Sequence, residues 1–115
     1  MQLPHIEDAH VPDSKISDYL LADDHPTGRS RAHFFRNLGF QKDRPAALRR
    51  ALLQHAAGNE VSSIQQTSFG AKYLIDGRIS GPNGDSAGVR SIWFIGAGEC
   101  GPRLITAYPL RGVTK

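Results

Sequence analysis

Hydrophobic and polar positions change their spacing after Gly58, and this change divides the chain into a helical half and a strand half. Before Gly58, apolar side chains recur at intervals of three and four residues, as they do on one face of an α-helix. The spacing predicts three helices, over residues 14–21, 30–38 and 44–57. The second helix is followed by Gly39 and Phe40, which favours a left-handed glycine and a contact from Phe40 back to Phe35.

After Gly58 the apolar residues occur in short runs of the kind found in β-strands. The pattern predicts strands over residues 61–69, 72–80, 89–95 and 103–108. Asp76-Gly77 predicts a hairpin turn within the second run. The run from Ile92 to Ile95 does not alternate, so we expect that strand to be buried on both faces. Helices followed by antiparallel strands predict an α+β domain, with the N-terminal helices packed on a four-stranded antiparallel β-sheet.

The length of 115 residues fits one globular domain with a modest core. We expect an N-terminal arm over residues 1–13, a domain over 14–110 and a tail over 111–115. No apolar run has the length of a membrane helix or the pattern of a signal peptide. Cys100 is the one cysteine, which excludes an internal disulfide and a cysteine-based zinc site. We therefore expect a cytoplasmic protein, although a toxin domain cut from a larger secreted protein would have the same features.

Charge is distributed unevenly along the helical half. Residues 1–24 contain six acids and one base, whereas residues 29–50 contain seven bases and one acid. A basic block of this kind favours an anionic partner, and nucleic acid is the first candidate. The alternative is a solvated helix surface balanced by the acidic N-terminus.

The last predicted strand places two hydroxyl groups close together. Positions two apart on a strand share a face, so we expect Leu104, Thr106 and Tyr108 to line one face of the sheet. This arrangement is suited to orienting a phosphate or to stacking on a base through Tyr108. The alternative is the ordinary preference of Thr and Tyr for a half-buried strand.

Arg31 is an unusual residue in the second predicted helix. The helical periodicity places its side chain between those of Phe34 and Phe35, on the side of the helix that we expect to face the core. A guanidinium that points inward or into a cleft suits phosphate binding, because it offers a planar fork of donors. The alternative is that Arg31 reaches back to solvent or pairs with an acid in the segment before it. Candidates for contact with an RNA backbone are the other basic residues of this helix and of the next, namely Arg29, His33, Arg36, Arg49 and Arg50.

His25 precedes this helix in a loop and has the ordinary pKa range that permits proton transfer near neutral pH. Cleavage of RNA by its own 2′-hydroxyl needs a base, an acid and donors for the charged phosphate, and it needs no metal. The candidate catalytic set is His25, Arg31, Thr67, Thr106 and Tyr108. We expect no metal and no cofactor, because the sequence holds no H-x-x-x-H pair and no nucleotide-binding glycine loop.

Three segments resemble a family of small uncharacterised bacterial proteins with an H-x-x-G-x-x-K-A-x-F-F motif and a terminal T-A-Y-P. They are His25-Pro26-x-Gly28-x-x-Arg31-Ala32-x-Phe34-Phe35, Thr67-x-x-Gly70-x-x-Tyr73 and Pro102 to Pro109. The layout is in turn similar to the barnase–EndoU–colicin/RelE-like class of metal-independent RNase toxins. This resemblance implies an RNase-toxin-like fold, RNA as substrate and a cognate antitoxin or immunity protein as partner.

By the same resemblance, His25 matches the loop histidine of the toxins, Arg31 the motif lysine, and Thr106 and Tyr108 the terminal motif. Arg31 keeps the charge of the lysine but does not transfer a proton, because arginine stays protonated. Ala32 stands where the toxins often have a threonine, and a second histidine is present only if His33 takes that role. Three interpretations therefore stay open: an active ribonuclease, a non-catalytic RNA- or protein-binding module, and an accessory subunit whose sheet edge binds a partner strand.

Overall fold

The computed structural model describes residues 1–16, 29–41 and 43–110 as helices on one antiparallel sheet. The helical elements are a short 3-10 turn η1 (Ile6–Asp8), α1 (Asp13–Lys15), α2 (Arg29–Asn37) and α3 (Pro45–Gly58). The strands are β1 (Val61–Thr67), β2 (Gly70–Ser80), β3 (Ser86–Gly96) and β4 (Arg103–Pro109), in the spatial order β1-β2-β3-β4. The α+β fold predicted from the sequence is confirmed.

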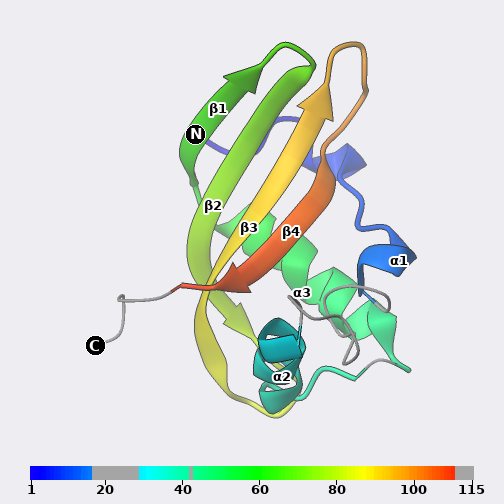
Figure 1. Cartoon of the computed structure of the whole chain (residues 1–115). Coiled ribbons are helices and arrows are strands. Elements are labelled where there is room, and N and C mark those ends of the chain that lie inside the picture. Colours follow the sequence, from blue (N-terminus) through cyan, green and yellow to red (C-terminus); the bar gives the residue numbers. More distant parts are fainter. Residues whose placement is uncertain (17–28, 42, 111–115) are drawn as a thin grey trace.

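The helices lie on one face of the sheet and leave the opposite face open among the described residues (Figure 1). Helix α3 crosses behind the strands, and α2 packs against β4 near the end of the sheet where that strand finishes. The core between the layers joins buried side chains of the helices to buried side chains of the inner sheet face, among them Phe35, Leu48, Leu52, Ile75, Val89, Trp93 and Leu104. We call the uncovered side the open face.

Local sequence signals fix where α2 ends. Gly39 has a φ of 100°, and the Phe40 N–H donates to the Phe35 carbonyl at 3.2 Å. This is the Schellman arrangement, in which a glycine without a Cβ takes the left-handed conformation at the helix end. The rings of Phe35 and Phe40 meet edge to face with centroids 6.3 Å apart, so the predicted contact is confirmed.

The predicted hairpin turn at Asp76-Gly77 is wrong, because β2 runs unbroken from Gly70 to Ser80. The Asp76 carboxylate accepts two hydrogen bonds from Arg90 of β3, at 2.7 and 2.9 Å. At Gly77 the Asn59 side chain lies where a Cβ would stand. Asp76 and Gly77 therefore make contacts that require a continuous strand, and these contacts outweigh the local preference for a turn.

The expectation that β3 is buried on both faces is also wrong. Val89, Ser91 and Trp93 are buried toward the helices, whereas Ile92 and Phe94 are half-buried on the open face. Large apolar residues on the open face hid the alternation in the sequence. The sheet therefore has one covered face and one accessible face that is partly apolar.

A buried polar network ties α3 to the middle strands. His55 Nε2 lies 3.0 Å from the Val89 carbonyl and 3.2 Å from the Gly77 carbonyl, so Nε2 carries the hydrogen, because carbonyls only accept. Nδ1 then accepts from the Ser91 hydroxyl at 3.1 Å, and the Ser91 oxygen accepts from Trp93 Nε1 at 2.8 Å. Burial lowers the pKa of His55, which keeps the ring neutral and the network satisfied.

The N-terminal segment, expected as an arm, contributes to the core. Leu3 and Val11 are buried, and His10 pairs in parallel with Arg103 of β4. Most of the helix predicted over residues 14–21 lies outside the described residues. Within the described part of the chain, no helix has the length and apolar character needed to cross a membrane.

Candidate functional site

A β-bulge in β4 decides which side chains reach the open face. Ile92 pairs with Thr106 and Trp93 pairs with Leu104, so Ile105 is the extra residue. Leu104 and Ala107 are buried against the helices, whereas Thr106 and Tyr108 share the open face. The prediction that these two hydroxyls share a face is confirmed, and the prediction that Leu104 joins them is wrong because the bulge reverses the alternation.

The Thr106 hydroxyl is buried without a hydrogen-bond partner among the described residues. Leaving a buried hydroxyl unpaired costs about 1–3 kcal/mol, so such a group calls for an explanation. Its strand neighbours on the open face are Ile92 across the pair and Tyr108 two positions on. Among the described residues, the donor and the acceptor of this hydroxyl are therefore unused, beneath a largely apolar part of this face.

Arg90 stands between the two neighbouring strands, opposite Asp76 on β2 and Tyr108 on β4. The Nε–H and one terminal N–H of its guanidinium donate to the two oxygens of the Asp76 carboxylate. The side chains of Arg90 and Asp76 are 34% and 29% exposed. The hydrogen bonds to Asp76 first, and to Tyr108 second, raise the pKa of Arg90 above its ordinary value. Arg90 is therefore a fixed cation beside the Tyr108 hydroxyl.

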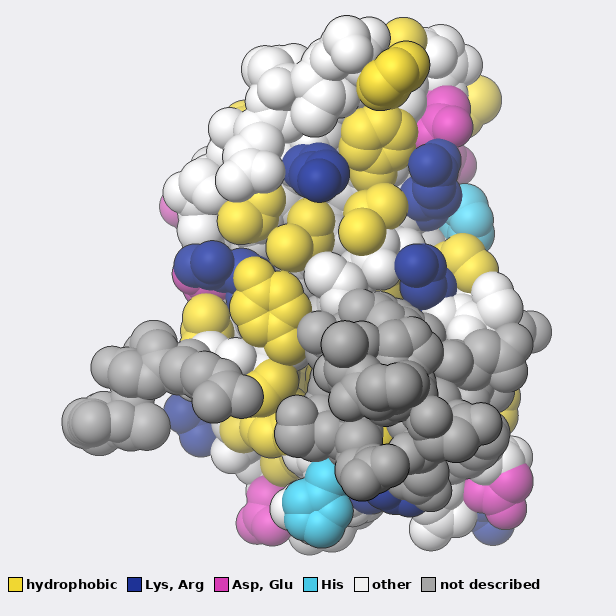
Figure 2. All heavy atoms as spheres, viewed as in Figure 1, with side chains coloured by type: hydrophobic (Ala, Val, Ile, Leu, Met, Phe, Trp, Pro, Cys, Tyr) yellow, Lys and Arg dark blue, Asp and Glu magenta, His cyan; other side chains and the backbone are white. Residues whose placement is uncertain are grey.

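Other cations border the apolar centre of the open face. Lys72 is paired with Phe94, and the Arg103 guanidinium lies 5.1 Å from the centre of the Phe94 ring. Arg103 also donates to Glu99 at 2.9 Å. Figure 2 shows a band of hydrophobic side chains along this face with Lys and Arg side chains on either side of it. These cations were not predicted from the sequence, because they are spread over three strands.

Thr67, a predicted catalytic residue, lies at the far corner of the sheet. Its hydroxyl donates to the Gly70 carbonyl at 3.0 Å and accepts from the Phe69 N–H at 3.1 Å, which closes the β1–β2 turn. The strand register places Thr67 about 13 Å along the strands and about 14 Å across them from Thr106. The structure therefore does not bring Thr67 and Thr106 together.

The remaining predicted residues fall into three groups. His25 lies outside the described residues, and Arg29 and Arg31 belong to α2 without a described side chain. His33 and Arg36 are exposed on α2. Arg49 and Arg50 line a cavity of about 510 Å³ between α3 and residues 6–9, on the helical side and away from the open face.

Helix α2 brings the sequence motif containing Arg31 to the end of the sheet that carries Tyr108. Its C-terminal end is tied to the β2–β3 turn, where the Asn83 side chain donates to the Asn37 carbonyl at 2.8 Å. Pro109, at the end of β4, pairs with Val89 of β3. Helix α2, which contains Arg31, therefore lies against the strand that carries Thr106 and Tyr108.

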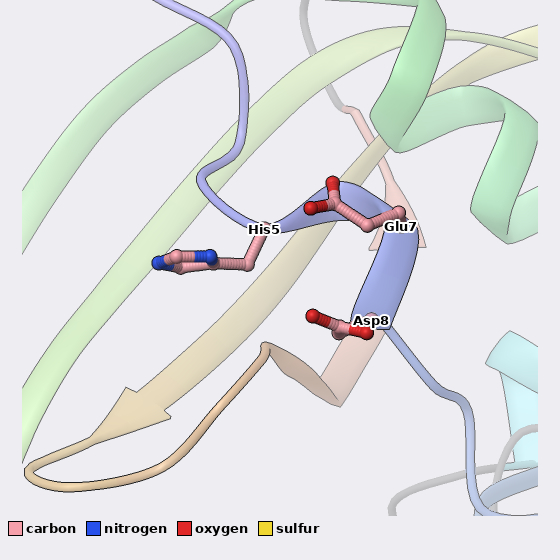
Figure 3. Close-up of side chains that lie close together, drawn as sticks. All are labelled: His5, Glu7 and Asp8. Carbon is pink, nitrogen blue, oxygen red and sulfur yellow. The ribbon is translucent and has the colours of Figure 1, made fainter.

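One group of side chains has the spacing of metal ligands. The ligand atoms of His5, Glu7 and Asp8 lie within 4.8 Å of one another (Figure 3), and all three residues are exposed. Exposed acidic groups often gather in this way without binding an ion, and we assign no metal to them.

Residues 2–111 match the family described as "Domain of unknown function (DUF6883)". The chain belongs to the DUF6883 family. This DUF6883 domain is also similar to a solved chain described as "Contact-dependent growth inhibition toxin - immunity protein complex from Klebsiella pneumoniae 342", with a TM-score of 0.72 and 22% sequence identity. The match covers 94% of this chain and 98% of that chain, and it shows a shared fold. No curated protein matches the sequence.

Proposed function

We propose that this DUF6883 domain is a toxin-like ribonuclease that cleaves RNA through the RNA's own 2′-hydroxyl, without a metal. The observation that carries the proposal is the Thr106 hydroxyl, which is buried and unpaired among the described residues, on the open face beside Tyr108 and Arg90. A polar group of this kind, set among apolar side chains and fixed cations, is suited to a phosphate or a base edge.

In the proposed reaction, the 2′-oxygen attacks the phosphorus and the bond to the 5′-oxygen breaks. His25 acts as the base that accepts the 2′-hydroxyl proton or as the acid that protonates the leaving 5′-oxygen, and the Tyr108 hydroxyl or solvent water carries the other proton. Arg31 stabilises the charge that develops on the phosphate, and Arg90 is a second cation for the same charge on the open face. The Thr106 and Tyr108 hydroxyls orient the phosphate, and Tyr108 also offers a ring for stacking on a base.

The proposed partner is a cognate immunity protein or antitoxin that covers the open face. The motif resemblance implies such a partner, and the structurally similar Klebsiella chain comes from a toxin–immunity protein complex. The proposed compartment of action is the cytoplasm, where RNA is the substrate.

The test is cleavage of total bacterial RNA by the purified chain in EDTA. Wild-type protein is expected to cut RNA, and His25→Ala and Arg31→Ala are expected to lose roughly a hundredfold or more of the rate. Tyr108→Phe tests the hydroxyl alone. Its matched control is Tyr73→Phe, because Tyr73 lies on the covered face of the same sheet and packs against the core.

Charge effects need a separate control. Arg90→Ala is expected to weaken RNA binding, whereas Arg44→Ala removes an equal charge from an exposed position before α3 and should leave binding and cleavage unchanged. Intact RNA together with salt-dependent binding would support the non-catalytic binding module instead. Cleavage that persists in both His25→Ala and Arg31→Ala would refute the proposed site.

A further inference from the structure

β1 is an edge strand whose side chains are exposed from Ser62 to Thr67. Within the described sheet it pairs only with β2. The other edge, β4, is extended by His10, which exchanges backbone hydrogen bonds with Pro102 and Leu104 at 3.0 and 3.1 Å. The free N–H and C=O groups of an edge strand form a template for pairing with another strand.

The β1 edge lacks the usual protection against such pairing. Residues 61–71 contain no charged residue and no proline, which are the features that natural proteins place on edges to prevent association. In Figure 2 this edge, at the upper left, is mainly white, the colour of backbone and uncharged polar side chains. Nothing in the strand's own charge opposes a second strand.

The exposed large hydrophobic residues of the described chain all lie along this edge. They are Met1, Ile64 and Phe69, with exposed fractions of 57%, 41% and 77%. The Met1 carbonyl accepts from the Val61 N–H at 2.7 Å, and Phe69 stands in the β1–β2 turn. Apolar groups gathered at one border mark an interaction surface more often than scattered single residues do.

Side-chain hydrogen bonds fix the conformation of β1 in the isolated chain. The Ser62 hydroxyl accepts from the Asp76 N–H at 3.1 Å, and the Thr67 hydroxyl closes the turn at the other end of the strand. A preorganised strand loses little conformational freedom on binding, which favours association.

We propose that the β1 edge binds a second copy of this chain, in antiparallel pairing with Ile64 on the two-fold axis. Ile64 is the central residue of β1, which spans Val61–Thr67. Pairing about it sets Ile64 against its own copy, Ser63 against Gln65 and Ser62 against Gln66. Every pair joins apolar to apolar or uncharged polar to uncharged polar, so the strand is complementary to itself.

The symmetry fixes the form of the assembly. Antiparallel pairing of two edges places the axis perpendicular to the sheet and joins two four-stranded sheets into one. Both open faces then lie on the same side and both helical layers on the other. Dimer formation does not depend on the proposed ribonuclease activity. A ribonuclease that stays monomeric would contradict the proposed dimer and leave the proposed function unaffected.

The first experiment measures mass against concentration by light scattering and sedimentation. Met1 already occupies the edge beside Val61, which leaves about five residues per copy for pairing, so we expect a weak dimer that forms at tens to hundreds of micromolar. Ile64→Lys sets two like charges against each other and is expected to remain monomeric. Its matched control is Ser80→Lys, which adds the same charge at an exposed position of β2 and should still dimerise.

The second experiment tests the register with single cysteines in a Cys100→Ser background. Ile64→Cys faces its own copy, with Cβ atoms about 5 Å apart, and should form an intermolecular disulfide under mild oxidation. Gln66→Cys should not, because the two copies of this residue stand about 13 Å apart along the strands.

The inference is overturned by a chain that stays monomeric at about 500 µM, which lies above most of the concentration range expected for the dimer. It is equally overturned by a dimer that Ile64→Lys leaves intact, or by cross-linking of the two cysteine variants at equal rates. Circular dichroism of Ile64→Lys separates loss of pairing from loss of folding, and Ile64→Cys keeps the test valid if the lysine variant unfolds.

Discussion

Ser91 sits at the centre of the buried network, and replacing it with alanine tests whether this network stabilises the fold. Ser91 has no exposed surface, and its oxygen serves two partners, His55 Nδ1 and Trp93 Nε1. Ser91→Ala leaves a buried acceptor and a buried donor unpaired. Because the core between α3 and β3 is closed, we do not expect water to replace the lost hydroxyl.

The expected cost follows from the two groups. An unpaired buried polar group costs about 1–3 kcal/mol, so the loss of stability should be about 3 kcal/mol. A domain of this size has a free energy of unfolding of roughly 6–17 kcal/mol, so the variant should still fold. Its melting temperature should fall by about 10 °C.

The assay is urea unfolding followed by Trp93 fluorescence, with circular dichroism as the second probe. Ser80→Ala is the control, because it makes the same change at an exposed position of β2 and isolates the strand preference of alanine. If Ser91→Ala lowers the free energy of unfolding by less than about 1 kcal/mol more than Ser80→Ala does, the Ser91 hydroxyl does not make the two hydrogen bonds that the distances indicate.

Three further predictions use other parts of the molecule. Because burial lowers the folded-state pKa of His55 below 6.5, the unfolded chain binds more protons, and stability should be full above pH 6.5 and fall as the pH drops below it. His55→Gln should flatten this dependence while His33→Gln keeps it, and equal slopes in both variants would contradict the assignment. Thr106→Val removes a buried hydroxyl that has no partner among the described residues, so it should leave stability unchanged or raise it by about 1 kcal/mol. RNA cleavage should fall, and a clear loss of stability would mean that the hydroxyl has a partner. Gly77→Ala places a methyl group against the Asn59 side chain and should cost more than about 1 kcal/mol in thermal unfolding, whereas an unchanged melting temperature would show that Asn59 moves aside freely.

The cations of the candidate site come from positions scattered along the chain. The basic block of residues 29–50 is obvious in the sequence, yet Arg49 and Arg50 lie on the helical side of the fold. The cations of the open face come singly from different strands, as Lys72, Arg90 and Arg103 do. Charge density along a sequence therefore does not predict charge density on a surface, because a sheet collects residues that are far apart in the chain.

The sequence by itself determined the elements whose signals are local. The change of apolar spacing indicated the helices and strands, and Gly39 with Phe40 indicated the end of α2, because helix geometry and glycine conformation depend only on near neighbours. Thr106 and Tyr108 were predicted to share a face on the same local ground.

Only the tertiary structure decided the features that depend on partners distant in sequence. Asp76-Gly77 continues a strand because Arg90 and Asn59 meet it, and the β4 bulge turns Leu104 to the core because the core needs an apolar side chain there. His55 finds Ser91 36 residues away. In each case a local conformational preference of about 1 kcal/mol competes with burial and hydrogen bonding that contribute several kcal/mol. Only the local preference can be predicted from neighbouring residues in the sequence.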